Sequence, residues 1–283
     1  MVEKTLHFYS DTANQSPFNN DRLVVEISAS YIAIWIKITD RQQIGAFELF
    51  HFDSEKMAWY DIFFDIRNLS KLLERGYTDT RVFYNFPQAV IVPAEKFDNE
   101  SAREYLALMH GEIMTDVVKF DNIKSSSPVV NVYRISKDLS DMVSGNLMMV
   151  NERHSFSVLV EDILRPDSPF KYTLHVKVQF HYDSISVAVA NNGKLLLVQS
   201  YDQNGSEDIL YHLLNILQQL NFKPDDAVLE LSGLFDLKCQ LYDDICNVFA
   251  KIKLDNITEE QKFHDMLEDY PKHYLTPFLK LIS

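Results

Sequence analysis

Apolar and polar residues form two similar series of predicted elements along this chain. In the first series, three apolar runs rich in β-branched residues, at 23–27, 31–38 and 47–52, are separated by short polar segments. This pattern is typical of three successive strands in a meander. A helix is predicted for 55–74, because its apolar residues recur every three or four positions, and Gly76 is a suitable residue to end it.

The second series begins at 174–180, where apolar residues alternate with His175, Lys177 and Gln179. Strict alternation predicts a half-buried strand with these three side chains on its exposed face. Five further elements are predicted after it: strands at 184–190 and 195–198, a helix from 206, a strand at 228–231 and a helix at 237–249. We expect the hydroxyl of Ser206 to cap the first of these helices. The order of elements in the second series repeats that of the first, which indicates an internal duplication.

The duplication predicts an α/β protein of two lobes, each a mixed sheet with a three-strand meander plus helices. The first lobe is assigned to residues 20–153 and the second to 154–283, with 165–169 as the best linker candidate. Short predicted strands and a helix at 101–109 form a small inserted unit near 82–128 in the first lobe.

The second lobe ends in a predicted helix and an apolar tail. Thr258 to Gln261 has the pattern of a capping box, which predicts a helix reaching Asp269, and residues 274–282 are mostly apolar. We expect this tail to dock on the protein's own core. Binding to a partner protein remains an alternative, and membrane binding is disfavoured because Lys272 and Lys280 are the tail's only basic residues.

Composition and charge exclude several classes of function. The 283 residues include 27 Lys plus Arg and 41 Asp plus Glu, a net charge of −14, which argues against binding to nucleic acid or anionic lipid. The first 20 residues do not have the pattern of a secretory signal, and no apolar run is long enough for stable membrane insertion. A cytoplasmic location is therefore expected, whereas the oligomeric state cannot be predicted.

Common catalytic and binding motifs are absent. The chain has no G-x-G-x-x-G, no G-x-x-x-x-G-K-[ST], no H-E-x-x-H, no C-x-x-C and no G-x-S-x-G, and its nine His are scattered. No catalytic residue and no metal ligand are assigned from the sequence.

Three segments at equivalent places of the two series are similar to the nucleotide-binding elements of one superfamily. They are 23–30, with Glu26, Ser28 and Ser30; 176–183, with Gln179, His181 and Asp183; and 229–234, with Ser232 and Gly233. Together with the duplicated meander and with Asn204-Gly205, they resemble the actin-like ATPase superfamily, whose lobes have a ribonuclease H-like fold. The resemblance places Glu26 where the family has Asp, and Ser28 and His181 where it has Gly.

Two further stretches resemble one particular family within this superfamily. Residues 92–98 and 208–211 are similar to an uncharacterised bacterial family of this fold, related to the cell-division actin and to the type IV pilus assembly actin-like protein. The resemblance implies a degenerate nucleotide cleft formed by Glu26, Ser28, Ser30, Asp183, Gly205, Ser232 and Gly233. Alternatively, Glu26 is a solvated charge at a strand end, and Ser232-Gly233 is an ordinary turn.

These residues favour a non-catalytic binding or scaffold protein without a cofactor. The alternative is a protein that binds Mg·ATP, or a weak ATPase, with Glu26 near the metal. A partner protein or peptide is expected, because the pilus-type relatives bind a peptide on the inserted unit or between the lobes. The aromatic residues of 59–64 and 83–86 are candidates for such a surface, although core packing explains most of them equally well.

Overall fold

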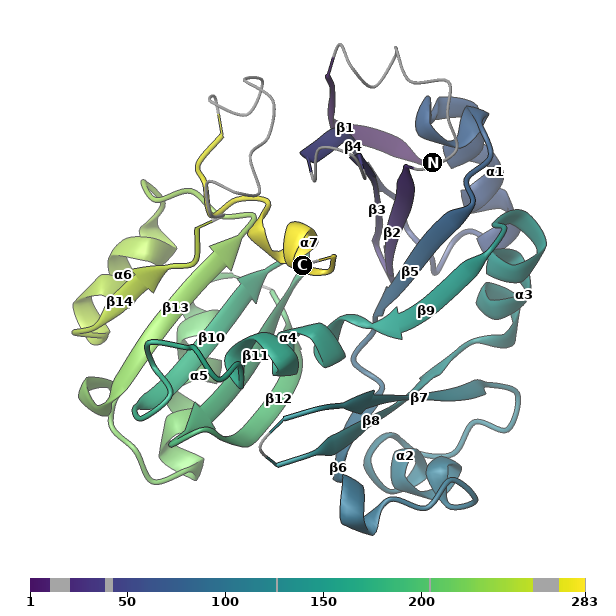
Figure 1. Ribbon diagram of the computed structural model, residues 1–283. Coiled ribbons are helices and arrows are strands. Elements are labelled where there is room, and N and C mark those ends of the chain that lie inside the picture. Colours follow the sequence, from purple (N-terminus) through teal and green to yellow (C-terminus); the bar gives the residue numbers. More distant parts are fainter. Residues whose placement is uncertain (11–20, 39–42, 126, 204, 257–269, 283) are drawn as a thin grey trace.

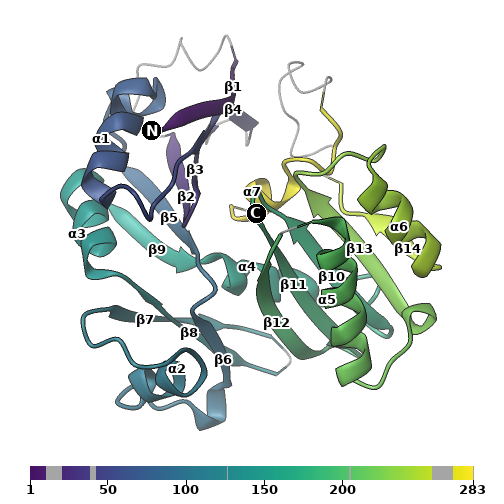
Figure 2. The same cartoon turned by 180° about the vertical axis from the view of Figure 1, so that it is seen from behind.

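The computed structural model describes residues 1–10, 21–38, 43–125, 127–203, 205–256 and 270–282. Two sheets with helices on their outer faces lie on either side of a central region that contains α4 (Ser155–Ile163) and α7 (Thr276–Lys280), and a small third sheet extends from the first lobe (Figures 1 and 2). The predicted helix of residues 258–269 lies outside the described residues.

The first lobe is a six-stranded sheet in the order β1-β4-β3-β2-β5-β9. Its strands are β1 (Glu3–Tyr9), β2 (Arg22–Ser28), β3 (Tyr31–Ile38), β4 (Gln43–His51), β5 (Asp79–Asn85) and β9 (Val150–His154). Strands β2, β5 and β9 are parallel, whereas β3, β4 and β1 continue the sheet as an antiparallel meander. Helices α1 (Trp59–Leu69) and α3 (Lys137–Asn146) pack on its outer face, and the single turn Leu72–Glu74 follows α1. The helix predicted for 55–74 is thus shorter than expected.

Strand β1 was not predicted. It is an edge strand whose residues are mostly exposed or half-buried, so it lacks the apolar run by which the other strands were recognised. Only its antiparallel pairing with β4 identifies it as part of the first lobe.

The inserted unit is a three-stranded antiparallel sheet in the order β6-β8-β7, covered by one helix. It consists of β6 (Ala89–Pro93), a short turn Ala94–Lys96, α2 (Ala102–His110), β7 (Val117–Ile123) and β8 (Val129–Ile135). The range predicted for it, 82–128, is corrected at both ends, because β5 belongs to the main sheet and β8 to the small one. In the sequence, β5 and β8 are both short apolar runs. Only the strands with which they pair show that β5 belongs to the main sheet and β8 to the small one.

The second lobe repeats the topology of the first. Its sheet has the order β12-β11-β10-β13-β14, which corresponds to β4-β3-β2-β5-β9, with the same parallel and antiparallel pairings. The elements are β10 (Leu174–Phe180), β11 (Ser184–Asn191), β12 (Lys194–Asp202), α5 (Ser206–Gln219), a turn Pro224–Asp226, β13 (Ala227–Gly233), α6 (Gln240–Val248) and β14 (Ile252–Leu254). Helices α5 and α6 cover its outer face.

Two predictions about the second lobe are wrong. All seven residues of β10 are buried, because elements between the lobes cover the face on which His175, Lys177 and Gln179 lie. The N-cap of α5 is Gly205, and Ser206 is the first helical residue, so the predicted Ser206 cap is not formed.

The region between the lobes is filled by two elements that pack against inner sheet faces. Helix α4 was not predicted, and seven of its nine residues are buried. The tail contributes Leu275, Phe278, Leu279, Leu281 and Ile282 to an apolar cluster with first-lobe residues such as Trp35 and Phe47. The tail therefore docks on the protein's own core, as expected.

Candidate functional site

The C-terminal tail, residues 271–282, lies between the two lobes (Figure 1). The Phe278 side chain is fully buried, and its ring meets three first-lobe rings nearly edge-on, with centroid distances of 6.1 Å to Tyr31, 6.2 Å to Trp35 and 5.4 Å to Phe47. It also meets the ring of His181, from the second lobe, at 6.4 Å. One side chain of the tail thus packs against both lobes.

Backbone hydrogen bonds attach the tail to each lobe as well. The N–H of Gly233, at the end of β13, donates to the carbonyl of His273 over 2.8 Å. On the other side, the ammonium of Lys37 from β3 donates to the carbonyl of Ile282 over 3.2 Å. The tail therefore connects β3 of the first lobe to β13 of the second.

A buried cluster of charged side chains fixes the tail to the second lobe. The ammonium of Lys177, 2% exposed, lies 2.5 Å from Asp162, 2.7 Å from Glu230 and 2.5 Å from Asp255. Lys280 of the tail shares two of these carboxylates, at 2.9 Å from Asp162 and 2.6 Å from Asp255. Three carboxylates thus surround two ammonium groups, which is the pairing that buried charges require.

The pKa values in this cluster follow from burial and from the neighbouring charges. Burial by itself would lower the pKa of Lys177, but Asp162, Asp255 and Glu230 together raise it above its usual value. Burial would likewise raise the pKa values of Asp162 and Glu230, yet the adjacent cations and hydrogen bonds hold both below their usual range. Lys177, Asp162 and Glu230 are therefore charged at neutral pH.

Glu26, the predicted acid of the first phosphate element, is 2% exposed, so its interpretation as a solvated charge is wrong. One carboxylate oxygen accepts a hydrogen bond from Ser155 at 2.7 Å, and the other accepts one from Tyr31 at 3.1 Å. Burial raises the pKa of Glu26 from 4.5 to about 7, although both hydrogen bonds act in the opposite direction. The side chain therefore joins β2 to β3 and to α4.

Tyr31 connects the turns that end β2 and β10. Its oxygen lies 2.8 Å from Nδ2 of Asn85 and 3.0 Å from Nδ1 of His181. Since the single Tyr31 proton is directed to Glu26, the Nδ1 of a neutral His181 is left to donate to Tyr31. Burial lowers the pKa of His181 to about 4, which keeps this imidazole neutral.

The remaining predicted residues occupy different surroundings. Ser28 is buried at the end of β2, and Ser30 is half-buried in the following turn. Asp183 is exposed in the turn between β10 and β11, while Gly205 is exposed at the N-cap of α5 with a φ of +152°. The lobes meet through Tyr31 and His181, which were not assigned to the site from the sequence.

The Ser232-Gly233 pair was predicted to lie against adenosine, or else to be an ordinary turn. Ser232 is fully buried, and its Oγ has no hydrogen-bond partner among the described residues. Gly233 has a φ of +105°, and a Cβ there would lie 2.1 Å from the carbonyl oxygen of Phe180. Close approach of β13 to the end of β10 therefore requires this glycine.

Sequence reasoning missed the charged cluster and its contact with the tail. The one clue was that polar residues alternate with apolar ones in β10. The polar side chains of that strand were interpreted as facing solvent, whereas they are buried. Nothing in the sequence indicated that Asp162, Glu230 and Asp255 would gather around Lys177 from three separate segments.

Solved structures share this architecture. A Bacteroides thetaiotaomicron protein with an actin-like ATPase fold and unknown function is similar with a TM-score of 0.73 and 18% identity, covering 83% of this chain and 91% of that chain. The type IV pilus biogenesis complex PilM–PilN contains a chain similar with a TM-score of 0.61 and 12% identity, covering 92% of this chain and 97% of that chain. At these identities the likeness shows the fold alone, and it confirms the predicted duplicated actin-like lobes.

Comparison of the sequence with known proteins and with models of protein families identifies the family to which this chain belongs. No significant match was found among curated proteins. No helix in the described parts of the chain has the length and apolar character needed to cross a membrane. The model of the family described as "Protein of unknown function (DUF3822)" matches residues 10–252, and this chain therefore belongs to that uncharacterised family with an actin-like ATPase fold.

Proposed function

We propose that this protein is a non-catalytic scaffold that has kept the actin-like fold but does not use nucleotide, and that it binds another protein. The observation that carries the proposal is the position of the tail. Residues 271–282 lie between the inner faces of the two sheets, where Phe278 packs against Tyr31 and His181 beside the predicted phosphate turns. The tail thus supplies contacts between the two lobes from within the chain itself.

The donor groups present do not fit Mg·ATP. Both carboxylate oxygens of Glu26 are engaged by protein hydroxyls inside the core, whereas a group that organises the Mg²⁺ shell needs its oxygens directed at the ion or its waters. The backbone N–H of Gly233 donates to His273 in the tail. In addition, His181 places an imidazole against Tyr31, at the position where the family has glycine to admit phosphate.

The proposal of a protein partner is supported by the fold likeness to PilM, which is described as part of a complex with PilN. That description concerns PilM only. For this chain, the absence of recognisable catalytic motifs and the exposed aromatic residues Tyr60 and Phe64 favour a binding role over turnover.

The test is a thermal-unfolding titration of the full chain with Mg·ATP and Mg·ADP up to millimolar concentration. A ligand at 100 times its Kd stabilises a protein by about 2.7 kcal/mol, which amounts to several degrees for a chain of this length. We expect no saturable shift and no phosphate release above a no-protein blank.

A saturable, Mg²⁺-dependent shift that is lost in Glu26→Gln would overturn the proposal in favour of nucleotide binding. Phosphate release abolished by Glu26→Ala would establish the ATPase alternative. Each variant is first compared with the unsubstituted chain by circular dichroism, so that loss of fold is not mistaken for loss of binding.

A further inference from the structure

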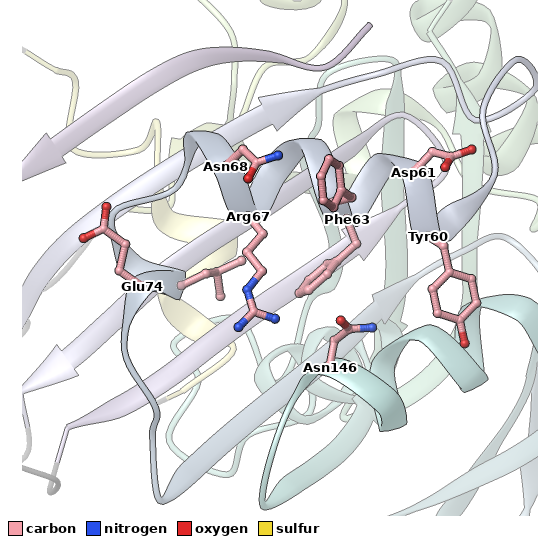
Figure 3. A pocket seen from close by; sticks show the side chains of 9 residues that line it. Tyr60, Asp61, Phe63, Arg67, Asn68, Glu74 and Asn146 are labelled. Atoms are coloured by element: carbon pink, nitrogen blue, oxygen red, sulfur yellow. The ribbon is translucent and has the colours of Figure 1, made fainter.

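A groove runs between α1 and α3 on the outer face of the first lobe, on the opposite side of the sheet from the tail (Figures 1 and 3). Its volume is about 770 Å³, within the range of sites that hold a ligand or a short peptide segment. Beyond Arg67 it continues into a smaller hollow lined by Leu73, Tyr77 and Met148. The groove is therefore longer than the space between the two helices alone.

One wall of the groove is an exposed aromatic stripe on α1. Tyr60 and Phe64 are four residues apart, so they lie on the same side of the helix, and they are 51% and 65% exposed. The core contacts of α1 are made by other side chains, namely Ile62, Phe63 and Ile66. Packing of the lobe therefore does not account for the stripe, and at the far end of the groove Met148 is also exposed, at 72%.

A cation is directed into the middle of this groove. Figure 3 shows the guanidinium of Arg67 pointing between the helices towards Asn146, whereas the carboxylates of Asp61 and Glu74 at the two ends point away from it. Among the described residues, no carboxylate lies within ion-pair distance of Arg67. A guanidinium flanked by an amide and by aromatic rings is suited to bidentate binding of a carboxylate.

We propose that this groove docks a segment of a partner protein that carries one carboxylate side chain between apolar side chains. The carboxylate pairs with Arg67, while its apolar neighbours pack on Tyr60 and Phe64 at one end and on Met148 at the other. The proposal rests on the proposed function in taking the partner to be a protein. A long acidic run does not fit, because the chain's own charge of −14 would repel it, whereas one carboxylate is attracted at close range.

The experiment is selection of a phage-displayed library of random 12-residue peptides on the immobilised full chain. We expect the enriched peptides to contain a single Asp or Glu with aromatic or large aliphatic residues within four positions of it. Synthetic versions should bind Arg67→Glu and Phe64→Ala at least tenfold more weakly than the unsubstituted chain. Binding to Lys137→Glu, an equal charge change at the exposed first residue of α3, should be unaltered.

Three outcomes would overturn the proposal. They are the absence of any enriched peptide, enrichment of basic peptides, and peptides that bind Arg67→Glu as tightly as the unsubstituted chain. A dimer in sedimentation that Arg67→Glu dissociates would assign the groove to a second copy instead. Because Arg67 and Phe64 are exposed, these variants should fold normally, and none of the outcomes depends on whether nucleotide binds between the lobes.

Discussion

The hydroxyl oxygen of Tyr31 in the first lobe lies 3.0 Å from Nδ1 of His181 in the second lobe. Each residue stands in or beside the turn where its lobe was predicted to bind phosphate, and both side chains are buried. Tyr31 also bonds to Glu26 and Asn85, so one hydroxyl group connects the predicted acid of the first lobe to the turn of the second.

Replacement of this hydroxyl tests the contact between the lobes. Tyr31→Phe leaves Asn85 and His181 buried without their partner, and an unsatisfied buried polar group costs about 1–3 kcal/mol. We expect the free energy of unfolding in urea to fall by about that amount. Tyr201→Phe is the control, because the Tyr201 hydroxyl donates to the nearby exposed Gln199, and it should change stability by less than about 0.5 kcal/mol. Equal effects of the two variants would contradict this account.

Phe278 is expected to be the main apolar anchor of the tail. Phe278→Ala empties a fully buried site between Tyr31, Trp35 and Phe47, and such a truncation typically costs about 3–5 kcal/mol. Urea unfolding should show this loss. The matched substitution Phe64→Ala removes a ring that is 65% exposed and should have little effect. A Phe278→Ala protein as stable as the unsubstituted chain would mean that the tail does not contribute to the fold.

Lys177 provides a prediction about pH. Lys177→Met leaves Lys280 as the partner of Asp162 and Asp255, and His175 as the partner of Glu230. Breaking a buried pair typically costs about 3–5 kcal/mol at neutral pH. The depressed pKa values of Asp162 and Glu230 stabilise the unsubstituted protein above pH about 4, and that contribution is lost as pH falls.

The stability difference between Lys177→Met and the unsubstituted chain should therefore be larger at pH 7 than below pH 4, where the carboxylates of the unfolded chain become protonated. Urea unfolding at several pH values measures it. Lys194→Met, at an exposed position of β12, is the control and should show no such trend. A difference that does not depend on pH would mean that the effect of Lys177 is steric and not electrostatic.

Glu26 should show the opposite dependence on pH. Its pKa is raised from 4.5 to about 7, so the folded state binds a proton more tightly than the unfolded state, and the ionised carboxylate opposes folding at higher pH. Relative to Glu26→Gln, the unsubstituted protein should lose up to about 3 kcal/mol between pH 4.5 and pH 8. The exposed substitution Glu112→Gln serves as a control. A relative stability that rises over this range would show that Glu26 is held as a carboxylate.

Gly233 is expected to be intolerant of any side chain. In Gly233→Ala, the new Cβ would lie 2.1 Å from the Phe180 carbonyl oxygen at a φ of +105°, so the end of β13 must move away from β10. We expect loss of soluble protein or a sharply lowered melting temperature. Gly145→Ala is the matched control, because no atom lies within 4 Å of its Cβ and alanine favours a helix by about 0.5–1 kcal/mol. Normal melting of Gly233→Ala would contradict the observed packing.

Where a strand is buried on both faces, its sequence was sufficient to predict it. Residues 31–38 are an apolar run whose strand was predicted with the bounds that the structure has. The duplicated order of strands and helices was also predicted, because the spacing of apolar residues indicates the same elements in the same order in both halves of the sequence. By contrast, β1 has no apolar run and was missed, since its place in the sheet comes from pairing with β4, more than 30 residues away in sequence.

For the candidate site, residue types could be predicted but not their partners. The sequence by itself determined the α/β class, the duplication and the acidic charge, because these are properties of local pattern and composition. Tertiary structure decided that Glu26 is buried, that Lys177 binds three carboxylates and that Phe278 fills the space between the lobes. These are contacts between residues 15 to more than 200 positions apart, and burial and charge pairing depend on which segments meet in space, which local periodicity does not specify.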